Sequence, residues 1–241
     1  MKAIIVIGLL CYSITGMCNE SLETRHKSRA HHAPKRLDTT PNKTSEDAWT
    51  LGLESNTYAT DTYLNPTLDY SAAGGWDFSI ASYGVKTQKA QSSDYNLFLG
   101  ISKTIDVTDG LSVLIGTQIG TNLFGNTHPI QGIGFANIVY DITEWLTVYS
   151  GMYYANREMS HIANEIGIMS GMTFKLIPGT LHLQADYIGG HSAVSGAEVN
   201  LQYSITETVQ GYIGVIVPEK NSGNEFAGVV GFNISTKDIM D

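Results

Sequence analysis

The sequence has few of the residues that cross-link small secreted domains or interrupt regular structure. It contains 2 cysteines and 6 prolines in 241 residues, and both cysteines, Cys11 and Cys18, lie in the first 18 positions. Removal of that leader after Cys18 leaves a chain without cysteine, which excludes a disulfide framework and cysteine-based metal sites. Charged residues make up only 15%, whereas glycine (25) and tyrosine (13) are abundant. This composition is typical of an all-β protein.

The leader has the order of residues expected of a secretory signal peptide. Lys2 precedes an apolar run over residues 3–12, and the small residues Gly16 and Cys18 permit cleavage after Cys18. Retention and acylation of Cys18 is the alternative. The run is too short to span a bilayer, and no other stretch approaches the roughly 18 apolar residues that a spanning helix needs. We therefore expect an exported chain with a signal peptide over residues 1–18.

Residues 19–48 lack apolar periodicity and predict a disordered tail. The tail carries 6 basic and 5 acidic residues, whereas residues 49–241 carry 7 basic and 18 acidic residues, a net charge of 7 − 18 = −11. Its basic stretch suggests electrostatic contact with anionic envelope components. His26, His31 and His32 form a possible metal cluster, for which a solvated tail is the alternative.

From Trp49 onward, segments of alternating polarity recur, each about nine to eleven residues long. That is the length a tilted strand needs to cross the hydrocarbon layer. The predicted strands cover 49–57, 64–72, 76–83, 95–104, 111–120, 131–140, 146–155, 164–174, 181–188, 197–204, 209–217 and 225–235. We therefore predict a closed antiparallel up-and-down transmembrane β-barrel of about 12 strands over residues 49–235, followed by a C-terminal tail over 236–241.

An internal repeat supports this count. Residues 105–113 (IDVTDGLSV) recur as 140–148 (YDITEWLTV), with a weaker echo at 203–209 (YSITETV). Each period holds two strands, one tight turn and one longer loop. Five tight turns thus alternate with six longer connections, which places short turns on one rim and long loops on the other.

This pattern resembles the bacterial outer-membrane β-barrel proteins of porin-like type over roughly residues 49–234. The resemblance implies a wall in contact with outer-membrane lipid, passage of small hydrophilic solutes, and association into a homo-oligomer as in many porins. The family usually ends on an aromatic residue, whereas here a polar tail follows Phe232.

The two faces of the predicted strands differ in chemistry. Apolar residues such as Leu51, Phe78 and Leu183 are assigned to the lipid side, and aromatic residues near the strand ends to a girdle at headgroup level. A soluble sandwich is the alternative, but its core could not bury the acids of the other face. The predicted pore-lining residues are Glu54, Asp69, Asp77, Glu165, His182, Asp186 and Glu198.

Six of these residues are acids and only His182 is basic, so we expect a mild preference for cations. The alternative is that side chains plug a narrow barrel. The glycines assigned to the interior would widen a lumen or ease strand curvature. They are Gly100, Gly116, Gly134, Gly151, Gly167 and Gly214.

Little in the sequence points to catalysis. The nearest candidate is His191 and Ser192 with Glu198 close behind, but adjacent residues on an extended chain point apart, and no acyl-hydrolase pattern matches. His128, His161 and His191 lie in three predicted loops that nothing fixes as a metal site. No phosphate-binding loop or basic-aromatic surface indicates a cofactor or nucleic acid. We expect no enzyme; an adhesion or structural envelope protein, and an outer-membrane lipid hydrolase, are the alternatives to a channel.

Overall fold

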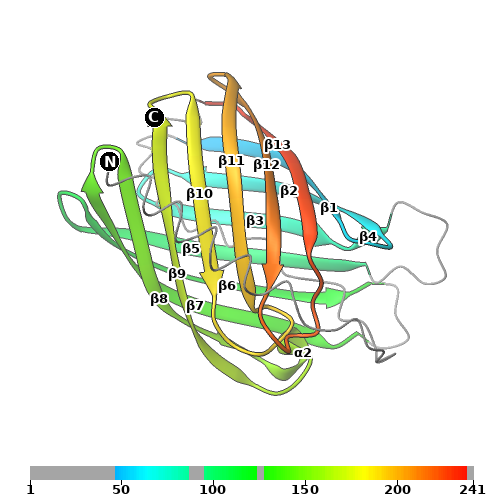
Figure 1. The fold of residues 1–241 in the computed structure, drawn as a ribbon. Helices are drawn as coiled ribbons and strands as arrows, with labels where there is room; N and C mark the ends of the chain where they lie inside the picture. Colours follow the sequence, from blue (N-terminus) through cyan, green and yellow to red (C-terminus); the bar gives the residue numbers. More distant parts are fainter. Residues whose placement is uncertain (1–46, 87–94, 124–127, 238–241) are drawn as a thin grey trace.

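The computed structural model describes residues 47–86, 95–123 and 128–237, which form one antiparallel sheet closed into a barrel (Figure 1). Its strands are β1 (Ala48–Thr57), β2 (Thr62–Ala72), β3 (Trp76–Tyr83), β4 (Val85–Lys86), β5 (Asn96–Thr108), β6 (Leu111–Asn122), β7 (Ile130–Thr143), β8 (Leu146–Ala155), β9 (Glu165–Ile177), β10 (Leu181–Ile188), β11 (Gly196–Thr206), β12 (Val209–Pro218) and β13 (Ala227–Ser235). β1 pairs with both β2 and β13, which closes the sheet. β4 has only two residues, so twelve strands form the wall and the predicted fold class is confirmed.

Three predicted strands, 76–83, 146–155 and 181–188, agree with the structure to the residue. β5, β7 and β9 run three or four residues beyond their predicted ends. A one-turn helix, α2 (Arg157–Ser160), lies in a connection predicted as a loop. The Asn156 side chain caps it by accepting the Met159 N–H at 2.9 Å. Within the described residues, no helix is both long enough and apolar enough to cross a membrane.

The internal repeat corresponds to a repeated hairpin turn. Asp106 accepts a hydrogen bond from the Ser112 hydroxyl at 2.7 Å, and Asp141 accepts the equivalent bond from Thr147 at 2.7 Å. The register shifts one residue before the turn in both hairpins, and again between Ser204 and Thr206 in the weaker echo. A β-bulge therefore precedes each of these turns. Because the turns alternate with the long connections, they share one rim of the barrel, here called the short-turn rim.

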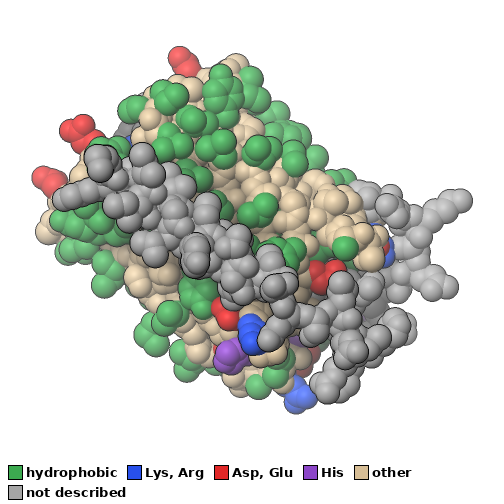
Figure 2. All heavy atoms as spheres, viewed as in Figure 1, with side chains coloured by type: hydrophobic (Ala, Val, Ile, Leu, Met, Phe, Trp, Pro, Cys, Tyr) green, Lys and Arg blue, Asp and Glu red, His purple; other side chains and the backbone are tan. Residues whose placement is uncertain are grey.

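Large apolar side chains cover the outside of the wall, as the green atoms of Figure 2 show. Aromatic rings gather at the short-turn rim: Trp49 and Tyr70 have ring centroids 4.7 Å apart, and Trp145 and Phe174 lie 5.9 Å apart. The Lys103 ammonium group lies 5.1 Å from the ring centroid of Trp76. An apolar band bordered by aromatic rings is the outer surface expected of a barrel in lipid.

The first and last strands meet at this same rim. Beyond β13, Thr236 continues the pairing, because its N–H donates to the Trp49 carbonyl at 2.9 Å and its hydroxyl accepts the Trp49 N–H at 3.0 Å. The Asp47 carboxylate accepts hydrogen bonds from the Ala73 N–H at 3.0 Å and from the Tyr70 hydroxyl at 2.8 Å, and these bonds lower the pKa of Asp47. The predicted signal peptide, most of the predicted tail (19–46) and residues 238–241 lie outside the described residues.

Candidate functional site: the barrel interior

All seven residues predicted to line a pore occupy register positions that face the inside of the barrel. Glu54 is 4% exposed and His182 is 7% exposed, and each shares its face with other buried polar residues. They lie on six strands: Glu54 on β1, Asp69 on β2, Asp77 on β3, Glu165 on β9, His182 and Asp186 on β10, and Glu198 on β11. Their role in a pore stays a prediction.

Much of the inner surface is polar along β10, β11, β1 and β2, and we call this the polar wall. Glu54 accepts hydrogen bonds from the Asn65 amide at 3.3 Å and from the Tyr212 hydroxyl at 3.1 Å. Asp186 accepts bonds from the Tyr149 hydroxyl at 2.8 Å and from the Gln184 amide at 3.0 Å. Because these donors are neutral, the bonds orient the carboxylates without cancelling their charge.

The expectation that His182 is the one basic residue inside was wrong. Lys175 is paired in register with His182, so both side chains leave the sheet on the same, inward side. The predicted strand ended at residue 174, but β9 continues to Ile177 and brings Lys175 into the wall. At the long-loop rim, Lys86 forms an ion pair with Asp61 at 2.7 Å. Lys175 therefore offsets part of the interior negative charge.

The opposite side of the interior is apolar, and sequence reasoning missed it. We call it the apolar wall, formed by inward residues of β3 and β5–β9 together with Met159 of α2 and Val194. Its members are Ala81, Tyr83, Phe98, Leu114, Ile133, Phe135, Val139, Tyr149, Tyr153, Ala155, Met159, Met169 and Val194. On these strands both faces are rich in apolar residues, which hides the alternation of polarity that identified the other inward residues.

Two of the interior glycines, Gly116 and Gly167, lie against aromatic rings. A Cβ atom at Gly116 would overlap the Phe135 ring, and one at Gly167 would overlap the Tyr153 ring. These glycines therefore make room for aromatic rings rather than leaving a wider lumen. Gly134 was assigned to the wrong face: it lies between the buried, inward residues Ile133 and Phe135 and points outward.

This close approach predicts a difference between two glycines in the wall. A Cβ atom at Gly171 would lie 2.6 Å from an Asp186 oxygen and 2.7 Å from the Ala185 carbonyl, and would also meet the Tyr149 ring. We expect Gly171→Ala to lower the free energy of unfolding by about 1–3 kcal/mol. Gly228→Ala should change it by less than about 0.5 kcal/mol, because nothing lies within 4 Å of a Cβ there. Urea unfolding in detergent micelles measures both, and equal losses would contradict the packing described.

At the long-loop rim, the connection between β10 and β11 folds into the mouth of the barrel. Glu165 holds it: one carboxylate oxygen accepts the His191 N–H at 2.8 Å, and the other accepts the hydroxyls of Ser192 and of Tyr153. Ser192, Ala193, Val194 and Ser195 are all buried. This set of contacts, which we call the Glu165 latch, narrows the mouth beside the apolar wall.

The candidate catalytic residues are not assembled into a nucleophile and base. Ser192 donates to Glu165 rather than to a histidine, and the exposed His191 contributes its backbone N–H to the same carboxylate. Glu198 instead accepts a bond from Asn200. The residues that the structure describes contain no group of three His, Cys, Asp or Glu suited to a metal ion.

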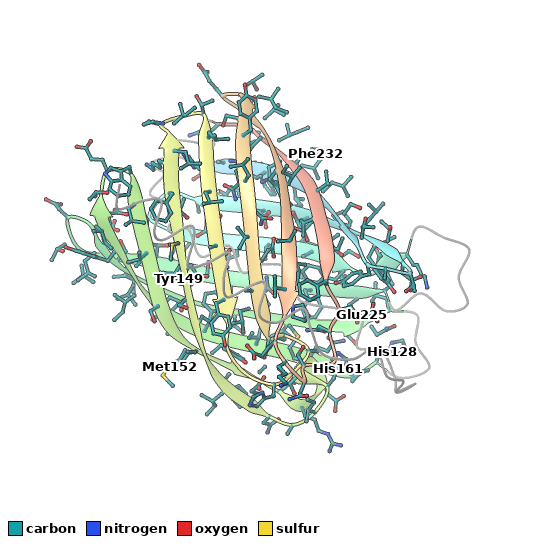
Figure 3. The ribbon with its side chains drawn as sticks, viewed as in Figure 1. His128, Tyr149, Met152, His161, Glu225 and Phe232 are labelled. Carbon is teal, nitrogen blue, oxygen red and sulfur yellow. The ribbon has the colours of Figure 1, made fainter. Side chains whose placement is uncertain are left out.

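The loop histidines are likewise separate. Figure 3 shows His128 and His161 at the long-loop end, on different connections. The His128 ring contacts the Asn122 carbonyl at 2.6 Å, and His161 ends α2 in the left-handed conformation. His26, His31 and His32 lie outside the described residues.

The outer wall is hollowed over β7–β11. The residues that line it include the small Ser150, Ser170 and Ala185 and the larger Tyr140 and Met152. Figure 3 shows Met152 directed away from the barrel. This groove is apolar and faces outward, so it suits hydrocarbon chains rather than a hydrophilic solute. A path for such a solute would have to lie inside the barrel.

Comparison with known proteins places the fold. No protein-family model matches the sequence, and no curated protein is significantly similar to it. Among solved structures, NanC porin aligns with a TM-score of 0.55 at 11% identity, over 79% of this chain and 100% of that one. Two further structures align at lower TM-scores. The Salmonella typhi outer membrane phospholipase dimer has a TM-score of 0.48 at 13% identity, over 86% of this chain and 96% of that one. Acinetobacter baumannii Omp33 has a TM-score of 0.46 at 11% identity, over 80% of this chain and 99% of that one. The chain thus has the fold of the bacterial outer-membrane β-barrel proteins.

Proposed function

We propose that the chain spans a bacterial outer membrane and acts as a passive, porin-like channel for small hydrophilic solutes, with a mild preference for cations. The observation that carries this proposal is the polar wall, where carboxylates face the inside of a closed barrel. A soluble core would not retain so many inward acids, because an unpaired buried carboxylate costs several kcal/mol. Inside a barrel they can face water.

The outer surface supports the membrane part of the proposal. Apolar side chains project outward from strands all around the wall, as Met152 and Phe232 do in Figure 3. In water such a surface would associate, whereas in lipid it is the favourable one. Export by the predicted signal peptide would deliver the chain to that membrane.

The route of a solute follows from the two walls. The apolar wall and the Glu165 latch fill one side of the interior, so passage would run along the polar wall, past Glu54, Asp186 and Glu198. Negative charge along this route attracts cations and repels anions. Lys175, which faces inward beside His182, limits the effect, which is why the preference is mild.

Single-channel recording in a planar bilayer under a KCl gradient tests this function. We expect discrete conductance steps and a reversal potential of the sign that cation selectivity produces. A barrel that inserts without conducting, or one that selects anions, would overturn the proposal.

A structural barrel without transport is the second candidate, and the aromatic rings packed over interior glycines favour it. The same recordings distinguish this candidate from a channel, because a structural barrel would insert into the bilayer without conducting ions. We propose no enzymatic role, since the Ser192 hydroxyl donates to Glu165, which the same contacts tie to Tyr153 and the His191 N–H, and no described histidine side chain accepts from it. Association into a homo-oligomer stays a prediction.

The Glu165 latch predicts a change in conductance. Glu165→Gln removes the charge that binds the Ser192 and Tyr153 hydroxyls, and losing charged acceptors of this kind costs about 1.5–3 kcal/mol. We expect the β10–β11 connection to leave the mouth more often, which raises the mean conductance. Glu219→Gln is the control, because Glu219 accepts a bond from the outward Tyr187 on the same rim. Equal conductance in all three proteins would show that the latch does not restrict passage.

A further inference from the structure

The described chain begins beside the acidic interior. Asp47 is held at the short-turn rim by Ala73 and Tyr70, and Ala48, the first residue of β1, is buried. Ala48 pairs with Ser71, which in turn pairs with Asp77. Asp69 lies two residues back along β2, on the same inward face. The first described residues, Asp47 and Ala48, therefore lie next to two interior carboxylates.

A stretch of the sequence before residue 47 carries the opposite charge. Residues 25–36 (RHKSRAHHAPKR) contain five Lys or Arg and three histidines, and no Asp or Glu. The intervening residues, 37–46, can reach about 33–36 Å when extended, at about 3.3–3.6 Å per residue. β2, with 11 residues, is about as long, and its height is less because barrel strands tilt. Residues 25–36 can thus reach every level of the interior.

We propose that residues 25–36 bind inside the barrel of their own chain, entering at the short-turn rim and lying against the polar wall. Asp69 and Asp77 meet the segment at the entrance, and Asp186 meets it farther in. Arginine and lysine form charge-assisted hydrogen bonds with carboxylates, and these bonds are strengthened where water is partly excluded. This inference rests on the barrel fold and on its interior charge, not on conduction.

Trypsin cleavage of the full-length chain in detergent micelles tests the proposal, because both rims are then accessible and the segment contains five cleavage sites. At low salt we expect cleavage within residues 25–36 to be about tenfold slower than in a wall variant, Asp69→Asn/Asp77→Asn/Asp186→Asn, since cleavage follows the released population. About 1 M salt should abolish the protection.

A matched rim variant, Asp109→Asn/Glu144→Gln/Glu207→Gln, removes the same charge from the exposed short turns and should keep the protection. Heat-modifiable gel migration establishes that each variant retains its barrel. Equal cleavage of the unmodified chain and the wall variant would overturn the proposal, as would equal release by the rim variant. Conductance of the same preparations is scored separately, so a silent barrel with a protected segment contradicts the channel and not this inference.

Discussion

Replacing Ile213 with arginine is expected to destabilise the bilayer-inserted barrel by about 2–4 kcal/mol. Ile213 lies in the middle of β12, faces outward and is 59% exposed. An arginine there must place its charge near the centre of the hydrocarbon layer, far from either headgroup region. The free energy of unfolding, measured by guanidinium titration in lipid vesicles, gives the loss directly.

Ile162 provides the matched control. It is 58% exposed, nearly the same as Ile213, but it lies in the connection between β8 and β9 at the long-loop rim. Ile162→Arg should cost no more than about 1 kcal/mol, because an arginine at that level can reach water. If both substitutions were neutral, the outer wall would not be in contact with lipid.

Neutralising the carboxylates of the polar wall is expected to remove cation selectivity. The variant Glu54→Gln/Asp186→Asn/Glu198→Gln keeps the shape of each side chain and deletes three interior charges. Interiors lined by one sign of charge carry potentials of several kT, so we expect the ratio of cation to anion permeability to fall at least about threefold, toward unity. The reversal potential reports this ratio independently of the total conductance, which the latch also affects.

The control for that experiment is the rim variant with Asp109, Glu144 and Glu207 changed to their amides. Its net charge equals that of the variant with three neutralised interior carboxylates, but its lost charges are at exposed turns, where solvent screens them. Selectivity should persist in it. If the variant with Glu54, Asp186 and Glu198 changed to their amides remained as selective as the unmodified chain, selectivity would have to originate elsewhere.

The turns and the alternation of the strands could be predicted because they depend on short stretches of sequence. The repeat that contains Asp106 and Asp141 is recognisable from the similar residues of its two copies. The structure shows the same hydrogen bond and bulge in both hairpins. The acids were assigned to the inward face because their neighbours along the strand are apolar. The sequence indicated the ends of strands less clearly. Because the predicted strand ended at residue 174, Lys175 was not assigned to the barrel interior.

The contents of the interior could not be predicted in the same way. Tyr153, Phe135 and Leu114 are inward yet resemble lipid-facing residues, and no local pattern tells apolar residues on the two faces apart. Gly134 was misassigned for the same reason. The Glu165 latch joins β9 to a connection 26 residues later in the chain, and such contacts are set by closure of the barrel rather than by sequence spacing.

The central claim, that alternating strands enclose a polar interior within a lipid-facing wall, is tested most directly by refolding the chain with and without lipid. We predict that the folded chain floats with vesicles, migrates as a compact form until boiled, and aggregates in buffer alone. A monomeric, folded chain that stays soluble in buffer without lipid or detergent would contradict the claim.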